Sequence, residues 1–166
     1  MANSNITADR LREMLDYDRN TGVFKWKINR TVRKSGDVAG FLTMYGYVSI
    51  GLDGFVVMAH RLAWIYVHGT APVGSIDHIN GNRKDNRIVN LRDVTHCVNT
   101  QNVRKVRSNN TSGLLGVSSS ASKSKPWKAS ITVNGKTRYI GIYKTKEDAH
   151  SAYVKEKRSL HSGCTL

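Results

Sequence analysis

The chain has 166 residues, of which 39% are hydrophobic, enough for the core of one ordinary domain or of two small ones, which excludes a disordered chain. Its 26 Lys and Arg residues outnumber 12 Asp and Glu, and the net charge of +14 favours a polyanionic partner, nucleic acid before an acidic membrane, over a merely soluble basic surface. We expect a cytoplasmic protein, because no run approaches the roughly 18 apolar residues of a membrane span and MANSNITADR lacks the order of a signal peptide. The cysteines, Cys97 and Cys164, form no C-x-x-C pair, so neither a disulfide framework nor a cysteine-based zinc site is predicted.

The first half of the chain predicts short helices and strands separated by turns. Thr7 is a plausible N-cap for the first helix, and Asp53-Gly54 is a strong hairpin signal. Gly69 and Pro72 end the second helix. The predicted elements are a helix over residues 8–17, a strand over 23–28, a loop over 30–36, a hairpin of 45–52 with 55–59, and a helix over 59–67.

The second half predicts two further groups of elements, divided by a polar break at residues 108–113, whose small residues favour an exposed linker. Asn134-Gly135 joins two strands, and Thr145 with Asp148 is a capping-box-like helix start. Two small domains joined by a polar hinge are therefore predicted. The elements are a strand over 75–79, a loop over 81–86, a return segment over 88–91, a helix capped by Thr95 and running towards Arg107, strands over 114–119, 127–133 and 137–143, and a helix over 146–160.

The stretch IDHINGNRKDNRIVNLR, residues 76–92, gathers side chains that suit a loop binding something charged. Adjacent strand residues point to opposite faces. One of Asp77 and His78 can therefore bind a metal while the other contacts a different group. Asn99, in the first turn of the following helix, can project back as a neutral oxygen ligand. Two such ligands suit Mg²⁺, which keeps waters and takes substrate phosphates. His78 could deprotonate a water near neutral pH.

The spacing of Asp77-His78, Asn90 and Asn99, with the segments I-D-H-I-N-G-N and N-L-R, closely resembles the HNH endonucleases of the phage and intron homing type. The preceding YVSI hairpin and AHRLAW helix are also similar to that group, so the resemblance covers most of residues 7–107. It implies a ββα-metal fold that hydrolyses a DNA phosphodiester bond. It also implies that His78 is the general base, that Asp77 and Asn99 hold a divalent ion such as Mg²⁺ or Mn²⁺, and that Asn90 fixes the loop that aims His78.

Each of these assignments has a structural alternative. Aspartate and asparagine side chains often stabilise turns, and His78 could be an exposed loop histidine. His96 and Asn102 lie one helical turn either side of Asn99 and compete for its ligand role. Three residues of the preceding helix are interpreted as structural: His60, His68 and Trp64.

Residues 113–161 resemble an Apetala-type, ethylene-response-factor-like DNA-binding domain, in which three antiparallel strands lie against one helix, and such modules are also found appended to phage HNH enzymes. The resemblance rests on the segments WKASI, YIGIY and TKEDA. Alternation places Ala129 and Ile131 on the helix side of the sheet. Serine and threonine stand where the plant domains carry arginines, so phosphate affinity is expected more than guanine readout. The alternative is a packing module without DNA contact.

These observations predict an α+β protein that acts as a site-specific, metal-dependent DNA endonuclease, with an HNH nuclease domain over residues 1–107 and its ββα-metal core over 73–107. A linker at 108–113 and an Apetala-type domain at 114–166 follow. Double-stranded DNA is the expected partner, with no small-molecule cofactor, and a monomer is favoured. A non-cleaving DNA-binding protein is the alternative, and an RNA-binding module is weaker because no aromatic stacking platform is found. The predicted DNA contacts are Arg92, Arg104, Lys105, Arg107, Ser118, Ser120, Lys128, Ser130, Thr132, Thr137 and Tyr139.

Overall fold

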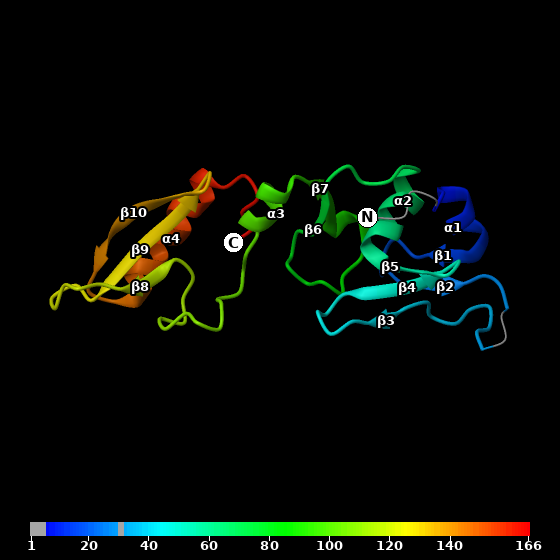
Figure 1. Cartoon of the computed structure of the whole chain (residues 1–166), viewed down its shortest axis with the longest axis horizontal. Coiled ribbons are helices and arrows are strands. Elements are labelled where there is room, and N and C mark those ends of the chain that lie inside the picture. Colours follow the sequence, from blue (N-terminus) through cyan, green and yellow to red (C-terminus); the bar gives the residue numbers. More distant parts are fainter. Residues whose placement is uncertain (1–5, 30–31) are drawn as a thin grey trace. The chain divides into compact units, whose positions relative to one another are not determined.

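The computed structural model describes residues 6–29 and 32–166, which form two compact units, Met1–His96 and Cys97–Leu166 (Figure 1). Helices and small antiparallel sheets occur in both units, so the predicted α+β class is confirmed. Two residues of the predicted loop at 30–36, Arg30 and Thr31, lie outside the described part of the chain. Within the described ranges, no helix has both the length and the apolar character that crossing a membrane requires.

The first unit begins with a helix that is shorter than predicted. Thr7 caps it as expected, because its hydroxyl accepts a hydrogen bond from the Arg10 backbone N–H at 3.2 Å. The prediction that this helix continues to residue 17 is wrong, since Leu15 and Tyr17 belong to a strand that pairs with a second strand. The elements in order are α1 (Ala8–Met14), β1 (Leu15–Tyr17), β2 (Phe24–Trp26), β3 (Phe41–Leu42), β4 (Val48–Leu52), β5 (Phe55–Met58) and α2 (Ala59–His68).

The predicted hairpin between β4 and β5 is confirmed. Asp53 and Gly54 form its turn with φ of 47° and 85°, the positive values that a tight two-residue turn requires. Gly69 ends α2 in the left-handed conformation, also as predicted. The sequence did not predict β3, which pairs with β4 through only two residues and is too short for an alternating pattern.

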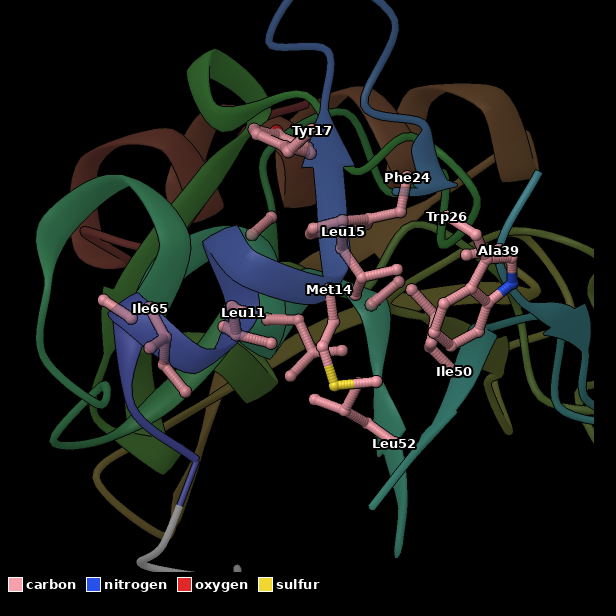
Figure 2. Packing of buried hydrophobic residues seen from close by; sticks show 14 of the residues in the cluster. Leu11, Met14, Leu15, Tyr17, Phe24, Trp26, Ala39, Ile50, Leu52 and Ile65 are labelled. Atoms are coloured by element: carbon pink, nitrogen blue, oxygen red, sulfur yellow. The ribbon is translucent and has the colours of Figure 1, made fainter. Parts of the chain in front are cut away.

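The core of the first unit lies where α1, α2 and the strands β1, β2 and β4 meet (Figure 2). Leu11, Leu15, Ile50 and Leu62 are fully buried there. Burying such a side chain stabilises a fold by about 1.5–3 kcal/mol relative to leaving it exposed. This core therefore gives the unit a rigid base, and Ile76, the second residue of the strand that follows α2, belongs to it as well.

A further hairpin follows in the first unit, formed by β6 (Ser75–His78) and β7 (Leu91–Val94). The predicted return segment at 88–91 is divided, because Ile88–Asn90 forms a 3₁₀ turn, η1, before β7 starts. The antiparallel register places Asp77 opposite Arg92 and His78 opposite Leu91. Asp93 anchors the start of the hairpin, since its carboxylate accepts the backbone N–H groups of Val73 and Gly74 at 2.7 and 2.8 Å.

The second unit contains β8 (Val117–Ser119), β9 (Trp127–Val133), β10 (Lys136–Tyr143) and α4 (Lys146–Leu160), together with α3 (His96–Gln101), whose first residue is the last residue of the first unit. The helix α3 stops well before the predicted end near Arg107. The segment after it packs with the C-terminal part of the chain, where the ammonium group of Lys157 donates to the Val103 carbonyl at 2.8 Å. The division between the two units therefore falls earlier in the chain than the linker predicted at residues 108–113.

The predicted three-stranded sheet of the second unit is present in the order β10-β9-β8, with α4 against one face (Figure 1). Ala129 and Ile131 are buried against α4 together with Ala149 and Tyr153, as the alternation predicted. Thr145 caps α4 by accepting the Asp148 N–H at 3.1 Å. Sheet and helix thus form a small core separate from that of the first unit.

Candidate active site

The hairpin of β6 and β7 buries both members of the Asp77-His78 pair. The exposed fractions of Asp77 and His78 are 6% and 4%. His78 is therefore not the exposed loop histidine of the structural alternative. Alternation along β6 turns the two side chains to opposite faces, and each meets its own partner. A buried polar pair of this kind must be satisfied by specific neighbours.

His78 is held by the amide of Asn86, whose Oδ1 lies 3.3 Å from His78 Nε2. Asn86 is itself fixed, since its Nδ2 donates to the Lys84 carbonyl at 3.3 Å and its own carbonyl accepts the Tyr17 hydroxyl at 2.6 Å. An amide oxygen only accepts, so Nε2 carries the proton of the neutral imidazole and Nδ1 carries the lone pair. The hairpin therefore assigns Nδ1 as the atom able to receive a proton. The sequence did not predict this role of Asn86.

Burial lowers the pKa of His78, and the hydrogen bond to Asn86 opposes this effect in part. The imidazole is therefore neutral at neutral pH, as a general base must be. Two more rings surround it: the centroid of His60 lies 5.1 Å from that of His78 at an interplanar angle of 89°, and the centroid of Tyr47 lies 6.0 Å away. Tyr47 also contacts His60, at 5.4 Å.

The sequence predicts only a structural role for His60, whereas the structure places its ring in contact with His78. It is 9% exposed, and burial, with a smaller contribution from His78, lowers its pKa to about 3. Among the described residues, His60 Nδ1 is buried and makes no hydrogen bond. Nothing local in the sequence marks this neighbour, because α2 and β6 are brought together only by the packed core.

Asn90 joins the two ends of the loop between β6 and β7. Its Oδ1 accepts the Asn80 N–H at 2.9 Å, its Nδ2 donates to the Asp85 carbonyl at 2.8 Å, and its backbone carbonyl accepts the Ile79 N–H at 2.9 Å. This is the position expected for a residue that fixes the loop next to His78. Its contribution to catalysis stays a prediction.

The many polar side chains of the loop are largely engaged with one another. Asp85 accepts two hydrogen bonds from the Arg87 guanidinium, at 2.7 and 2.6 Å, one from the Arg87 backbone N–H at 3.3 Å, and one from Asn80 at 2.7 Å. The bonds from Arg87 lower the pKa of the Asp85 carboxyl, whose side chain is only 10% exposed, to about 2. The loop also packs closely on the turn before β2, where a side chain at Gly22 would collide with the backbone of Asn86 and Arg87. The network holds the loop in one conformation.

Asp77 faces Arg92 across the hairpin, and Asp77 Oδ2 accepts hydrogen bonds from Arg92 Nε and Nη2 at 2.9 and 2.7 Å. Arg92, predicted to contact phosphate, therefore has a protein partner. A carboxylate oxygen suits a hard divalent cation. A metal ion at Asp77 would have to share the carboxylate with Arg92 or displace the guanidinium. Among the described residues, no cluster of three or more His, Cys, Asp or Glu side chains accompanies it.

Asn99, predicted as the second metal ligand, lies half-buried on α3, which the structure groups with the second unit. Its competitors His96 and Asn102 flank it at the start of α3 and just beyond its end. Asn102 accepts a hydrogen bond from the Thr165 hydroxyl near the C-terminus. The ligand role of Asn99 stays a prediction.

The predicted DNA contacts of the second unit lie partly on one face of its sheet. The register pairs Ser118 with Lys128, Ser130 with Tyr139, and Thr132 with Thr137, and antiparallel partners share a face, the one opposite α4. Ser120 is half-buried and accepts the Ser122 N–H at 3.3 Å. Of the predicted DNA contacts that follow α3, Lys105 and Arg107 are exposed, whereas Arg104 binds the side chain and carbonyl of Thr165.

Residues 57–101, which include α2, the β6–β7 hairpin and α3, match the family model described as HNH endonuclease. The chain thus carries an HNH endonuclease domain. It is 31% identical to Protein 3.8 of Escherichia phage T7 over 107 residues, which cover 58% of this chain and 87% of the phage protein, and it belongs to the same family as that protein. A structure of the HNH homing endonuclease I-HmuI, from work on its DNA binding and cleavage, is 28% identical with a TM-score of 0.42 and spans 54% of this chain and 51% of the other.

Proposed function

We propose that this protein is a metal-dependent, site-specific DNA endonuclease of the homing type. The observation that carries the proposal is the buried His78, whose Nε2 is held by Asn86 so that Nδ1 is the proton acceptor, in a chain with an HNH endonuclease domain. A neutral imidazole held in one orientation is what the activation of a water by a general base requires. The net charge of +14 supports a nucleic-acid substrate.

In this proposal His78 removes a proton from the water that attacks the phosphate. Asn86 and Asn90 are positioning residues. Asn86 orients the His78 ring, and Asn90 holds the loop between β6 and β7 closed. Asp77 is the proposed ligand of a divalent ion such as Mg²⁺ or Mn²⁺, and Asn99 remains its predicted companion. When bound, the ion would supply positive charge that stabilises the phosphate and the leaving 3′ oxygen.

We further propose that the second unit binds double-stranded DNA through the sheet face opposite α4. Lys128 supplies charge on that face, and the exposed Thr132, Thr137 and Tyr139 supply hydroxyl groups. Hydroxyls contact phosphates or base edges, so this face adds affinity more than strict sequence discrimination. The resemblance of this unit to an Apetala-type domain supports the proposal.

A non-cleaving DNA-binding protein is the second candidate, and the pairing of Asp77 with Arg92 favours it, because the guanidinium occupies a carboxylate that a metal would need. Incubation of the full chain with host genomic DNA in Mg²⁺, followed by mapping of new ends, separates the two. We expect cleavage that stops in EDTA and is lost in Asp77→Asn, while the control Asp16→Asn, an exposed acid of β1, stays active. DNA binding without any new ends would support the second candidate instead.

A further inference from the structure

Arg83, at the exposed side of the loop between β6 and β7, is held in place more firmly than an ordinary surface arginine. Its guanidinium lies over the Tyr47 ring, 4.8 Å from the centroid, and its Nη1 donates to the Tyr45 carbonyl at 2.9 Å. Both contacts come from the turn that precedes β4, a turn closed by the Gly46 N–H donating to the Thr43 carbonyl at 2.9 Å. Much of the side-chain entropy that an arginine loses on binding a ligand is therefore already lost.

The ring that supports Arg83 is also part of the candidate active site. Tyr47 contacts the rings of both His78 and His60. Arg83 is thus connected to the proposed general base through one side chain, and its guanidinium is presented on the solvent side of that ring. A ligand bound by Arg83 would lie close to the group on which His78 acts.

The charge of Arg83 is not neutralised within the described part of the chain. Arg87 and Arg92, the other arginines of the hairpin, pair with Asp85 and Asp77 at 2.6 and 2.7 Å, whereas no carboxylate of residues 6–29 or 32–166 pairs with Arg83. A guanidinium has five N–H donors in a rigid fork, and the bond to Tyr45 uses one of them. The remaining fork matches two oxygens of one phosphate group.

We propose that Arg83, fixed on Tyr47, binds a backbone phosphate of the DNA beside the phosphodiester bond that is attacked by the water activated by His78. This inference rests on the proposed endonuclease function, to which it adds a phosphate-binding residue outside the Asp77, His78, Asn90 and Asn99 set. A backbone phosphate fits better than a base edge, because stacking on Tyr47 and the bond to Tyr45 hold the guanidinium at the protein surface. The +14 charge of the chain points to the same polyanionic ligand.

The test uses the full chain and DNA duplexes carrying a site that the protein selects by binding in EDTA, with a neutral methylphosphonate replacing one phosphate at a time. Affinity is measured by fluorescence anisotropy in EDTA, so the readout does not depend on cleavage. For wild type we expect one phosphate near the bound hairpin whose neutralisation weakens binding at least about tenfold, the range of a lost charge-assisted contact. In Arg83→Ala the same neutralisation should have no further effect, and the salt slope should fall by about 0.9 in magnitude.

Two variants sharpen this test. Arg83→Lys should keep the salt slope but lower the single-turnover cleavage rate at saturating enzyme, because a point charge lacks the planar fork. Lys84→Ala removes the same charge from the next exposed position, which no ring supports, and should leave the methylphosphonate profile of wild type intact. If Arg83→Ala keeps the wild-type profile, the inference is overturned, even when wild type cleaves DNA normally. Failure of wild type to cleave would instead reject the proposed function, and the binding profile would still decide the role of Arg83.

Discussion

Replacing His60 with phenylalanine should make the stability of the first unit less dependent on pH. Burial lowers the pKa of His60 from 6.5 to about 3, so near pH 5 the unfolded chain binds a proton at this position that the folded chain does not. The contribution of His60 to the free energy of unfolding is therefore fully present above pH 6.5, the pKa of the unfolded chain. It is lost progressively as the pH falls towards 3, the pKa of the folded chain. Between pH 7 and pH 5 the loss is about 2 kcal/mol.

The assay is urea unfolding at pH 5, 6 and 7, followed by tryptophan fluorescence. A Trp127→Phe background leaves Trp26 and Trp64, both in the first unit, as the reporters. His60→Phe also removes a buried nitrogen without a hydrogen-bond partner among the described residues, so we expect little loss at pH 7 and a pH dependence smaller by about 2 kcal/mol. The control Ile65→Val, in the same helix, should cost about 0.5–1.5 kcal/mol equally at each pH. An unchanged drop from pH 7 to pH 5 in His60→Phe would refute the reasoning.

Three further outcomes follow from the packing and from the proposed DNA contacts. Gly22→Ala should destabilise the first unit by more than about 1 kcal/mol in urea unfolding, because its φ of +73° is unfavourable and the new side chain meets the loop backbone; an unchanged midpoint would contradict the described packing. Gly116→Ala should unfold the second unit, since its side chain would enter the Tyr153 ring, and backbone NMR should show the first unit still folded. Lys128→Ala should lower the magnitude of the salt slope of DNA binding by about 0.9, and an unchanged slope would argue against this sheet face as a DNA contact.

The elements that the sequence predicted well are those whose signals are local. Asp53-Gly54 and Asn134-Gly135 both adopt positive φ, which few other residue pairs tolerate, so each hairpin could be located before its partner strands were known. Thr145 starts α4 for a similarly local reason. The end of α1 could not be predicted, because Leu15 fits the apolar face of a helix as well as it fits a strand, and pairing with β2 decides between them.

The candidate site was predicted in its residues but not in its contacts. Asp77, His78 and Asn90 lie together in one hairpin, as their spacing indicated. The pairing of Asp77 with Arg92 depends on the register of β6 and β7, which no sequence pattern showed. The contact between His60 on α2 and His78 on β6 depends on the tertiary packing of these two elements, so no sequence pattern could predict it.

The central claim, that His78 is the base of a DNA-cleaving site, is tested most directly by His78→Ala in the full chain. The rate of cleavage of a mapped duplex in Mg²⁺ and the affinity for the same duplex in EDTA are measured side by side for this variant and wild type. We predict a rate lower by about 10²–10⁴, the usual contribution of a general base, with nearly unchanged affinity, because the variant removes the base and none of the proposed phosphate contacts. Cleavage by His78→Ala at the wild-type rate would contradict the account.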